Sequence, residues 1–298
     1  MRRFLLASLG LLIVCTPVPT GAWGFDVHRL IAERAIALLP VEIRPFYEKY
    51  RVTFVEHAID PDLWRSAGFE EEPPRHFVDL DAYGAPPFAA LPHDYDQAVQ
   101  KFGREFVNKN GTLPWRAEEI ADRLTSAFSD MNRPDPGYAY DNLKFFSSVI
   151  AHYVADAHVP FHSALNYDGQ LTRQWGIHSR FESQVVMQFL PQLRIEARPA
   201  APVRDVREAV FRWLTDGYSQ VAPILAADRR AVEGRDEYDE KYFNQFFATT
   251  RPVLERQLSS AITDVAAVIT GTWEAGGKPK LPLDPPRITK KVRREPSR

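Results

Sequence analysis

The chain has 298 residues, a formal net charge of −2 at pH 7 and a single cysteine, Cys15. The charge is unevenly spread, because residues 278–298 carry +6 and residues 1–22 carry +2, which leaves about −10 for residues 23–277. A segment with this much negative charge is a poor electrostatic match for duplex DNA unless bound metal ions cancel the charge locally. One cysteine excludes a disulfide framework within the chain, so stability must come from a hydrophobic core and from bound metal.

The first 22 residues read MRRFLLASLGLLIVCTPVPTGA, with two arginines, a short apolar run and small or turn-forming residues at the end. This is the pattern of a secretory signal peptide, and the apolar run is too short to span a bilayer as a helix. We therefore predict cleavage before Trp23 and a secreted or periplasmic protein. A lipoprotein signal at Cys15 is the alternative, which Val14 disfavours because a small residue is expected there.

Beyond Trp23 the chain shows mainly helical periodicity. A first helix ends at Pro40 and carries His28 in its first turn, and an irregular segment with turn signals then covers residues 53–84. Further helices are predicted at residues 94–107, 114–129, 140–159, 178–193, 203–226 and 238–269. No run of alternating β-branched residues is long enough for a sheet. The predicted fold is therefore all-α, with a single multi-helix domain over residues 23–277 and its metal site at the base of a cleft.

Residues 278–298 are rich in proline, lysine and arginine and have almost no apolar content. This composition predicts a disordered tail. Anchoring to acidic phosphate headgroups is the alternative role for so basic a segment.

The stretch 151–183 holds four of the eight histidines, and two of its three carboxylates are spaced from histidines in a way that suits metal binding. Its polar residues form two pairs spaced four apart and one single histidine after Pro160: His152 with Asp156, His178 with Glu182, and His162. Residues four apart on a helix share a face. Imidazole nitrogens and carboxylate oxygens are zinc ligands, and this set is larger than one tetrahedral ion can use. The residues therefore predict a multi-metal cluster.

Four motifs, in order, give the chain a resemblance to known proteins: WGFDVH after the predicted cleavage site, PDLWR followed by RHFVD, HYVADAHVPFH, and GIHSRFE. Together they resemble the superfamily that joins the bacterial zinc-dependent phospholipases C to the trinuclear-zinc single-strand nucleases. The last motif, which ends in Glu182, looks closer to the phospholipase form. The first two look like the nuclease form, so the substrate class stays open between phospholipid and single-stranded nucleic acid.

The resemblance implies three zinc ions held by nine residues. The implied ligands are Asp62, His76, His152 and Asp156 for one ion; His162, His178 and Glu182 for a second, more exposed ion; and Trp23, His28 and Asp156 for the third. Trp23 would bind through its α-amino nitrogen and carbonyl oxygen, and Asp156 would bridge two ions. Asp60 is the alternative to Asp62, although the continuation Asp62-Leu63-Trp64-Arg65 favours Asp62.

Zinc lowers the pKa of a bound water toward ~7, so hydroxide is available near neutrality, and paired ions polarise phosphoryl oxygens. A phosphodiester is the natural substrate of such a set. By resemblance, Asp62 would both ligate and orient the hydroxide. Arg65 would contact the phosphate or have only a structural role. Because the Trp23 α-amine is free only after cleavage, we expect signal removal to complete the third site.

The leading prediction is a secreted phosphodiester hydrolase of the phospholipase C type, using a metal-bound hydroxide to cleave the glycerol–phosphate bond of a phospholipid. One alternative is an endonuclease that acts on single-stranded DNA or RNA and leaves 5′-phosphates. A non-enzymatic zinc-binding helical protein is the other, and the completeness of the ligand set argues against it. We expect a monomer without a stable protein partner, in transient contact with a membrane surface.

The remaining histidines are expected outside the metal cluster. His57 and His93 are predicted to be surface or loop residues, and His158 to have a structural or supporting role. Four aromatic residues either line a substrate pocket or pack in the core, and the sequence leaves both readings open: Phe77, Tyr83, Tyr167 and Trp175.

Overall fold

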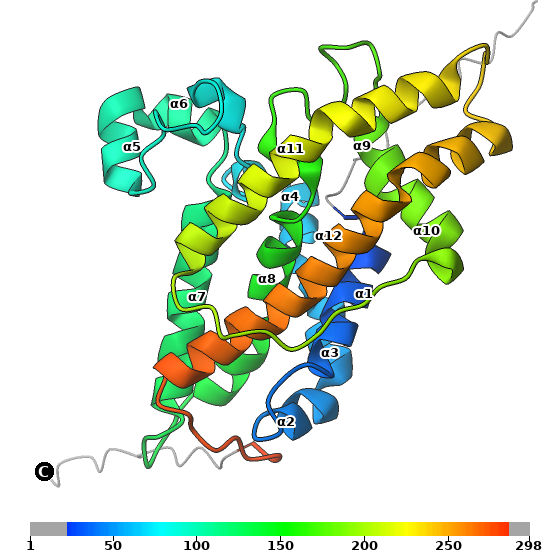
Figure 1. Ribbon diagram of the computed structural model, residues 1–298. Helices are drawn as coiled ribbons and strands as arrows, with labels where there is room; N and C mark the ends of the chain where they lie inside the picture. Colours follow the sequence, from blue (N-terminus) through cyan, green and yellow to red (C-terminus); the bar gives the residue numbers. More distant parts are fainter. Residues whose placement is uncertain (1–22, 286–298) are drawn as a thin grey trace, which may run out of the picture.

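The computed structural model describes residues 23–285, and these are helical with no strand (Figure 1). The prediction of an all-α fold is therefore confirmed. The predicted signal peptide and residues 286–298 of the predicted tail lie outside the described residues. No helix within residues 23–285 combines the length and the apolar composition that crossing a membrane requires.

Six α-helices and three short 3-10 helices precede residue 110: α1 (Phe25–Ile36), α2 (Arg44–Lys49), α3 (Arg51–Glu56), η1 (His57–Ile59), α4 (Asp60–Ser66), η2 (Pro73–His76), η3 (Leu80–Tyr83), α5 (Tyr95–Phe102) and α6 (Arg104–Lys109). The later elements are α7 (Leu113–Asp130), α8 (Ala139–Asp156), η4 (Pro160–Ser163), α9 (Ile177–Ser179), the π-helix η5 (Arg180–Gln184), α10 (Val185–Phe189), η6 (Leu190–Gln192), α11 (Val206–Val232) and α12 (Glu240–Ala275).

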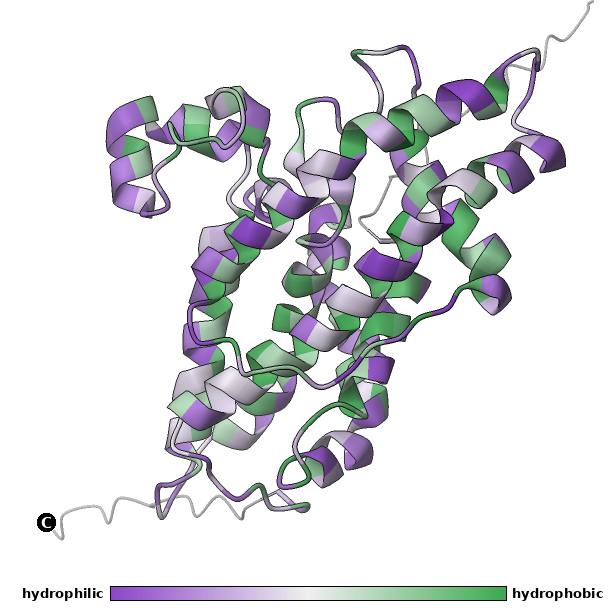
Figure 2. Ribbon diagram, in the orientation of Figure 1, coloured by the Kyte–Doolittle hydropathy of each residue, from purple (hydrophilic) through white to green (hydrophobic). Residues whose placement is uncertain are grey.

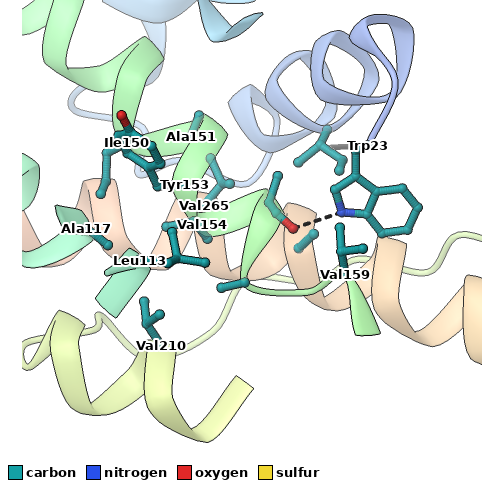
Figure 3. Packing of buried hydrophobic residues seen from close by; sticks show 14 of the residues in the cluster. Trp23, Leu113, Ala117, Ile150, Ala151, Tyr153, Val154, Val159, Val210 and Val265 are labelled. Carbon is teal, nitrogen blue, oxygen red and sulfur yellow. Dashed lines mark hydrogen bonds between the residues drawn. The ribbon is translucent and has the colours of Figure 1, made fainter. Parts of the chain in front are cut away.

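Helix α8 is the centre of the domain. It packs against α1, α3, α7 and α12, and its C-terminal half, from Ser147 to Asp156, is entirely buried. Figure 3 shows part of this core, where Val154 of α8 lies among apolar side chains that include Leu113 of α7 and Val265 of α12. A helix end that is buried on every side leaves its polar residues no access to water. The last turn of α8 therefore needs partners inside the protein.

The two longest helices, α11 and α12, run across the domain side by side (yellow and orange in Figure 1). Each begins at an aspartate whose carboxylate accepts a backbone N–H of the first turn: Asp205 from Glu208 at 3.0 Å and Asp239 from Tyr242 at 2.8 Å. Figure 2 shows apolar and polar residues alternating around both helices, as expected for helices that bury one side and expose the other.

Three predicted helices differ from the observed ones. The helix predicted over residues 94–107 is two helices, because Gly103 takes φ +85° between α5 and α6. The helix predicted over 140–159 ends at Asp156, before Pro160 begins η4. The helix predicted over 178–193 is a succession of α9, the π-helix η5, α10 and η6.

The first part of the predicted disordered tail is bound to the domain. Trp273 Nε1 donates to Pro279 O at 3.0 Å, the Tyr140 hydroxyl donates to Leu283 O at 2.8 Å, and Lys49 pairs with Asp284 at 2.6 Å. Leu281 also packs against the core. Residues 278–285, the start of the predicted disordered tail, thus contact the domain through one leucine and a few backbone carbonyls.

Candidate metal centre

The predicted ligand side chains come from seven separate elements and meet at the C-terminal end of α8. They are supplied by α1 (His28), α4 (Asp62), η2 (His76), α8 (His152 and Asp156), η4 (His162), α9 (His178) and η5 (Glu182). All eight residues are at most 8 % exposed. Such a concentration of buried histidines and carboxylates requires a partner that all of them share.

The side chains form three groups, within each of which one ligand atom per residue lies within 4.8 Å of the others. The groups are Asp62, His76 and His152; His28, His152 and Asp156; and His162, His178 and Glu182. They follow the three implied ions with two differences: His152 belongs to two groups instead of one, and Asp156 belongs to one group instead of two. The structure therefore brings together all eight side chains that the sequence singled out.

Asp156 lies at the centre of the cluster. Its Oδ2 is 2.9 Å from His76 Nδ1 and 3.2 Å from His152 Nε2. Its Oδ1 is 3.4 Å from His28 Nε2 and 3.7 Å from His162 Nδ1. The two oxygens of one carboxylate thus face different groups, which is the arrangement a bridging ligand requires.

The donor atoms of this cluster fit a cation. Among the described residues, buried atoms without a hydrogen-bond partner include both ring nitrogens of His28, both carboxylate oxygens of Glu182, Asp156 Oδ1, His162 Nδ1 and His178 Nε2. Buried polar atoms are almost always satisfied in folded proteins. Unsatisfied nitrogens and oxygens that converge in this way are the donor set that zinc takes in tetrahedral sites.

Protonation states in the cluster also suit metal binding. Burial raises the cost of ionising Asp156, but the charge and hydrogen bond of His152 outweigh it and hold the pKa of Asp156 well below its usual range. Burial lowers the pKa of His162 well below the ordinary value, so its ring is neutral and has a free lone pair. Burial raises the pKa of Glu182 to about 7 despite His178 beside it. The pair of Glu182 and His178, 3.0 Å apart, thus retains a proton that a cation would displace.

The segment that carries His178 and Glu182 is fixed from behind by Arg180. This buried guanidinium pairs with Asp228 at 3.1 Å and donates to the Tyr242 hydroxyl at 3.0 Å. The turn here is a π-helix, a rare geometry that is frequent at functional sites. Both ligand residues are therefore held on a rigid element.

Trp23 and Gly24 are attached to the neighbours of two ligand residues. The Trp23 indole is fully buried and donates to Ala155 O at 2.8 Å (Figure 3), and Gly24 N donates to Ser183 Oγ at 3.1 Å. A Cβ added at Gly24 would lie 2.7 Å from Ser183 Oγ, so a larger residue here would displace the serine side chain. The Trp23 indole is thereby held against the last turn of α8, at the residue before Asp156.

The choice between the two aspartates follows from their surroundings. Asp62 is fully buried within the cluster, whereas Asp60 pairs with His57 at 2.9 Å at the surface. Arg65, one turn after Asp62, lies 3.0 Å from its Oδ1. The geometry therefore favours Asp62, and it places the Arg65 guanidinium at the edge of the cluster.

A cleft of about 610 Å³ opens onto the cluster. Its lining includes the ligand residues His76, His162 and His178, the cations Arg65 and Lys109, and a larger number of apolar side chains. A larger hollow, of about 820 Å³, lies beside Trp115 and is lined by charges of both signs but by none of the eight residues. The smaller cleft is the one next to the metal-binding chemistry.

The structure distinguishes the four aromatic residues whose role the sequence left open. Phe77 and Tyr167 line the cleft, whereas Tyr83 is buried against Phe102 and Phe106. Trp175 does neither, because it is 65 % exposed and is not part of the cleft lining.

The three remaining histidines lie outside the cluster. His57 and His93 are exposed and pair with Asp60 and Glu208. His158 is buried against Trp213, with Asp264 at 3.1 Å. All three therefore have partners of their own, away from the metal-binding groups.

Glu72 is part of the site, although it is not among the residues predicted from the sequence. Its carboxylate is buried, 3.6 Å from Nε2 of His76, on the side of the ring that faces away from Asp156. The Tyr153 hydroxyl and Arg75 also donate to it. The spacing of four residues between Glu72 and His76 was a usable signal, but Pro73 and Pro74 between them argued against a helix.

A comparison with protein families agrees with this geometry. No curated protein matches the chain significantly. The model of the family described as zinc dependent phospholipase C matches residues 27–227, which is more than half of the chain and includes all eight clustered side chains. That family consists of zinc-dependent phosphodiester hydrolases, and the three groups of buried side chains fit zinc binding. From its motifs, its helical fold, its buried ligand set and this match, we conclude that the chain belongs to the zinc-dependent phospholipase C family.

Proposed function

We propose that the protein is an exported phospholipase C that hydrolyses the bond between glycerol and phosphate in a phospholipid. The observation that carries this proposal is the composition of the cleft. Three of the clustered histidines form one part of its lining, and apolar side chains form most of the rest: Pro73, Phe77, Phe161, Leu165, Leu171 and the ring of Tyr167. A phospholipid presents a phosphodiester directly beside an apolar body, which is the combination this lining accommodates.

Three zinc ions are proposed, held by the eight clustered side chains and by the amine and carbonyl of Trp23. When bound, zinc lowers the pKa of a coordinated water toward ~7 and offsets charge on a phosphoryl group. The buried carboxylate of Asp62 would orient the attacking water. The Arg65 guanidinium, beside Asp62 and in the cleft lining, would bind a phosphate oxygen.

Export is the second part of the proposal. If the signal peptide is removed before Trp23, the new α-amine would bind in the third site, and the hydrogen bond from the Trp23 indole to the carbonyl of Ala155, the residue before Asp156, supports this placement. Processing would then complete the third zinc site. Two extra residues before Trp23 should reduce the zinc content by one ion per chain. A protein with this extension that kept full zinc content would contradict the idea.

A paired assay tests the substrate. The zinc-loaded protein that starts at Trp23 should release phosphocholine from phosphatidylcholine, and His152→Ala, which removes a residue of two ligand groups, should abolish turnover. Zinc content and circular dichroism of the variant distinguish loss of metal from loss of fold. Absence of lipid turnover by a protein that holds its zinc would overturn the proposed substrate.

A nuclease is the second candidate, and one observation favours it. Phe77 and Tyr167 lie in the cleft with Arg65 and Lys109, so an unpaired base has rings to stack on and its phosphate has cations nearby. Single-stranded DNA therefore forms the other arm of the assay. Cleavage of DNA alone, lost in His152→Ala, would move the protein to this function.

A further inference from the structure

The loop of residues 164–176 connects η4 to α9 beside the metal centre, at the top of Figure 1. Its large apolar side chains are exposed, whereas an ordinary surface loop exposes mainly polar side chains. Leu171 is 69 % exposed, Trp175 65 %, Tyr167 50 % and Leu165 37 %. A contiguous group of large apolar side chains on the surface marks an interaction site rather than a random exposure.

Two amide side chains of the same loop point inward. Asn166 and Gln174 are buried. Asn166 Oδ1 accepts Leu171 N at 2.8 Å, and Gln174 Nε2 donates to Leu225 O and to Asp228 Oδ2, each at 2.7 Å. The buried amides thus hold the backbone of the loop in one shape. The apolar side chains are presented on a preformed surface, and little conformational entropy would be lost when they bind a partner.

Further contacts restrain the turn itself. Gly169 takes φ +72°, and a Cβ there would lie 2.5 Å from Gln174 O. Gln174 N donates to Gly169 O at 2.9 Å, which closes the turn that carries Leu171. Leu171 is therefore carried by a fixed turn, with its side chain exposed.

We infer that this loop is a docking surface for the bilayer, inserting Leu171 into the apolar zone beneath the headgroups and Trp175 at the boundary of that zone. The inference rests on the proposed function, since a phospholipid must reach the metal centre from the membrane. Leu165, Tyr167 and Leu171 also line the cleft that contains His162 and His178, so the exposed group is continuous with the cleft.

The chemistry of the loop favours a lipid surface over a nucleic acid. Leucine offers no ring on which a base can stack, whereas leucine inserts into acyl chains and tryptophan and tyrosine prefer the headgroup boundary. The loop has one aspartate and one arginine, Asp168 and Arg173, and therefore no net charge with which to attract phosphates. Binding should depend on apolar contact and survive about 0.5 M salt, where the attraction of exposed charges is screened.

The test measures binding and turnover separately. Binding is followed by co-sedimentation with vesicles of a phosphonate analogue of phosphatidylcholine, whose bond to glycerol is not hydrolysed. Trp175→Gln and Leu171→Gln should each weaken binding about tenfold, as expected for one large apolar side chain kept out of the membrane. Val52→Gln is the matched control, because Val52 is 75 % exposed in α3, away from the loop in Figure 1, and should leave binding unchanged.

Turnover is compared on vesicles and on dispersed short-chain phosphatidylcholine. Trp175 does not line the cleft, so Trp175→Gln should lose vesicle turnover about tenfold and keep turnover of the dispersed lipid. Turnover of neither lipid by the wild-type protein, with loop-dependent vesicle binding retained, would overturn the proposed substrate and leave the docking surface standing.

Other outcomes would overturn the docking surface itself. These are no vesicle binding by the wild-type protein, equal binding by the two loop variants and the wild type, or binding that disappears in high salt. Binding of single-stranded DNA that depends on Trp175, without vesicle binding, would assign the loop to nucleic acid instead.

Discussion

The carboxylate of Glu72 faces one ring nitrogen of His76, while the other nitrogen points toward Asp156 and Asp62. A carboxylate in this position fixes the ring orientation of a metal-binding histidine and increases its basicity. Tyr153 and Arg75 hold the Glu72 side chain in turn. His76 is therefore oriented by a chain of buried contacts that reaches from α8 to the surface.

We predict that Glu72→Gln lowers the affinity for zinc about 10- to 100-fold, because the amide is a weaker acceptor for the His76 ring. Competition with a chromogenic chelator measures the change without reference to activity. Glu71→Gln is the control, since the Glu71 carboxylate is exposed and pairs only with Arg75, at 3.1 Å. Equal zinc affinities of the two variants would remove the assigned role of Glu72.

Asp79 shows a different effect of burial. It lines the cleft, and burial, with a smaller contribution from Asp81, raises its pKa from 3.8 to about 7. Between these values the folded protein holds a proton that the unfolded chain has released. The contribution of Asp79 to the free energy of unfolding therefore falls as the pH rises from about 4 to about 7, and this contribution is constant above that range.

Asp79→Asn should remove this penalty in the zinc-free protein. The variant should be more stable than the wild type by on the order of a few kcal/mol at about pH 8, and nearly equal to it at about pH 4. Urea unfolding of both proteins at the two pH values measures the difference. A stability difference that does not depend on pH would show that Asp79 is ionised in the folded state.

At the scale of single residues, the sequence predicted most of the side chains that form the cluster. The spacing of four between His152 and Asp156, and between His178 and Glu182, placed each pair on one face, and the structure brings both pairs into the cluster. Glu72 could not be predicted from the sequence, because its contact with His76 depends on the tight 3-10 turn at Pro73–His76. The two prolines in this turn do not predict it.

Among the elements, the segment that joins α10 to α11 is attached to α12 in an unusual way. The backbone N–H groups of Arg194, Glu196 and Arg198 donate to side chains of α12 at Glu255, Ser259 and Thr263. Two residues of extended chain rise about as far as four residues of helix, so the two series stay in step. The segment then reaches Val203, whose carbonyl lies against Gly271 of α12.

Gly271→Ala should destabilise the protein by about 1–3 kcal/mol, because a Cβ there would lie 1.8 Å from the Val203 carbonyl oxygen. Gly217→Ala in α11 is the control. Its Cβ would meet Pro160 at 3.4 Å, an ordinary contact, and alanine favours the helix by up to about 1 kcal/mol. Thermal unfolding of the two variants measures the contrast, and similar melting temperatures would contradict the close packing.

The sequence predicts the helices better than the connections between them. Apolar periodicity located α8, α11 and α12, since each buries a continuous stripe. The extended segment after η6 has only a short apolar alternation, in which Leu193, Ile195 and Ala197 pack against the core. Its other contacts use backbone N–H groups, and residues 278–285 are bound largely through backbone carbonyls. Contacts made by backbone groups are difficult to predict from the sequence, because they depend little on which side chains are present.

For the molecule as a whole, the metal centre links parts of the chain from His28 to Glu182. The centre also gathers three fully buried carboxylates: Asp62, Asp156 and Glu182. Without a cation, these carboxylates and the unsatisfied histidine nitrogens oppose the compact state. Zinc binding energy therefore contributes directly to the stability of the fold.

Removal of zinc with a chelator should lower the melting temperature by about 10 °C or more, and added zinc should restore it. Differential scanning calorimetry with and without chelator measures the shift. An unchanged melting temperature after complete metal removal would mean that the fold tolerates the buried carboxylates without a cation.

The C-terminal segment that binds near α2 has a practical consequence. Its last described residues lie at the end of the domain remote from α9, as Figure 1 shows. A tether joined to the chain directly after residue 285 would therefore leave the domain at the end opposite α9 and its His178. Immobilised on a sensor chip through such a tether, the molecule would present the side of α9 to the solution, and lipid capture would be measurable without the chip surface covering that side.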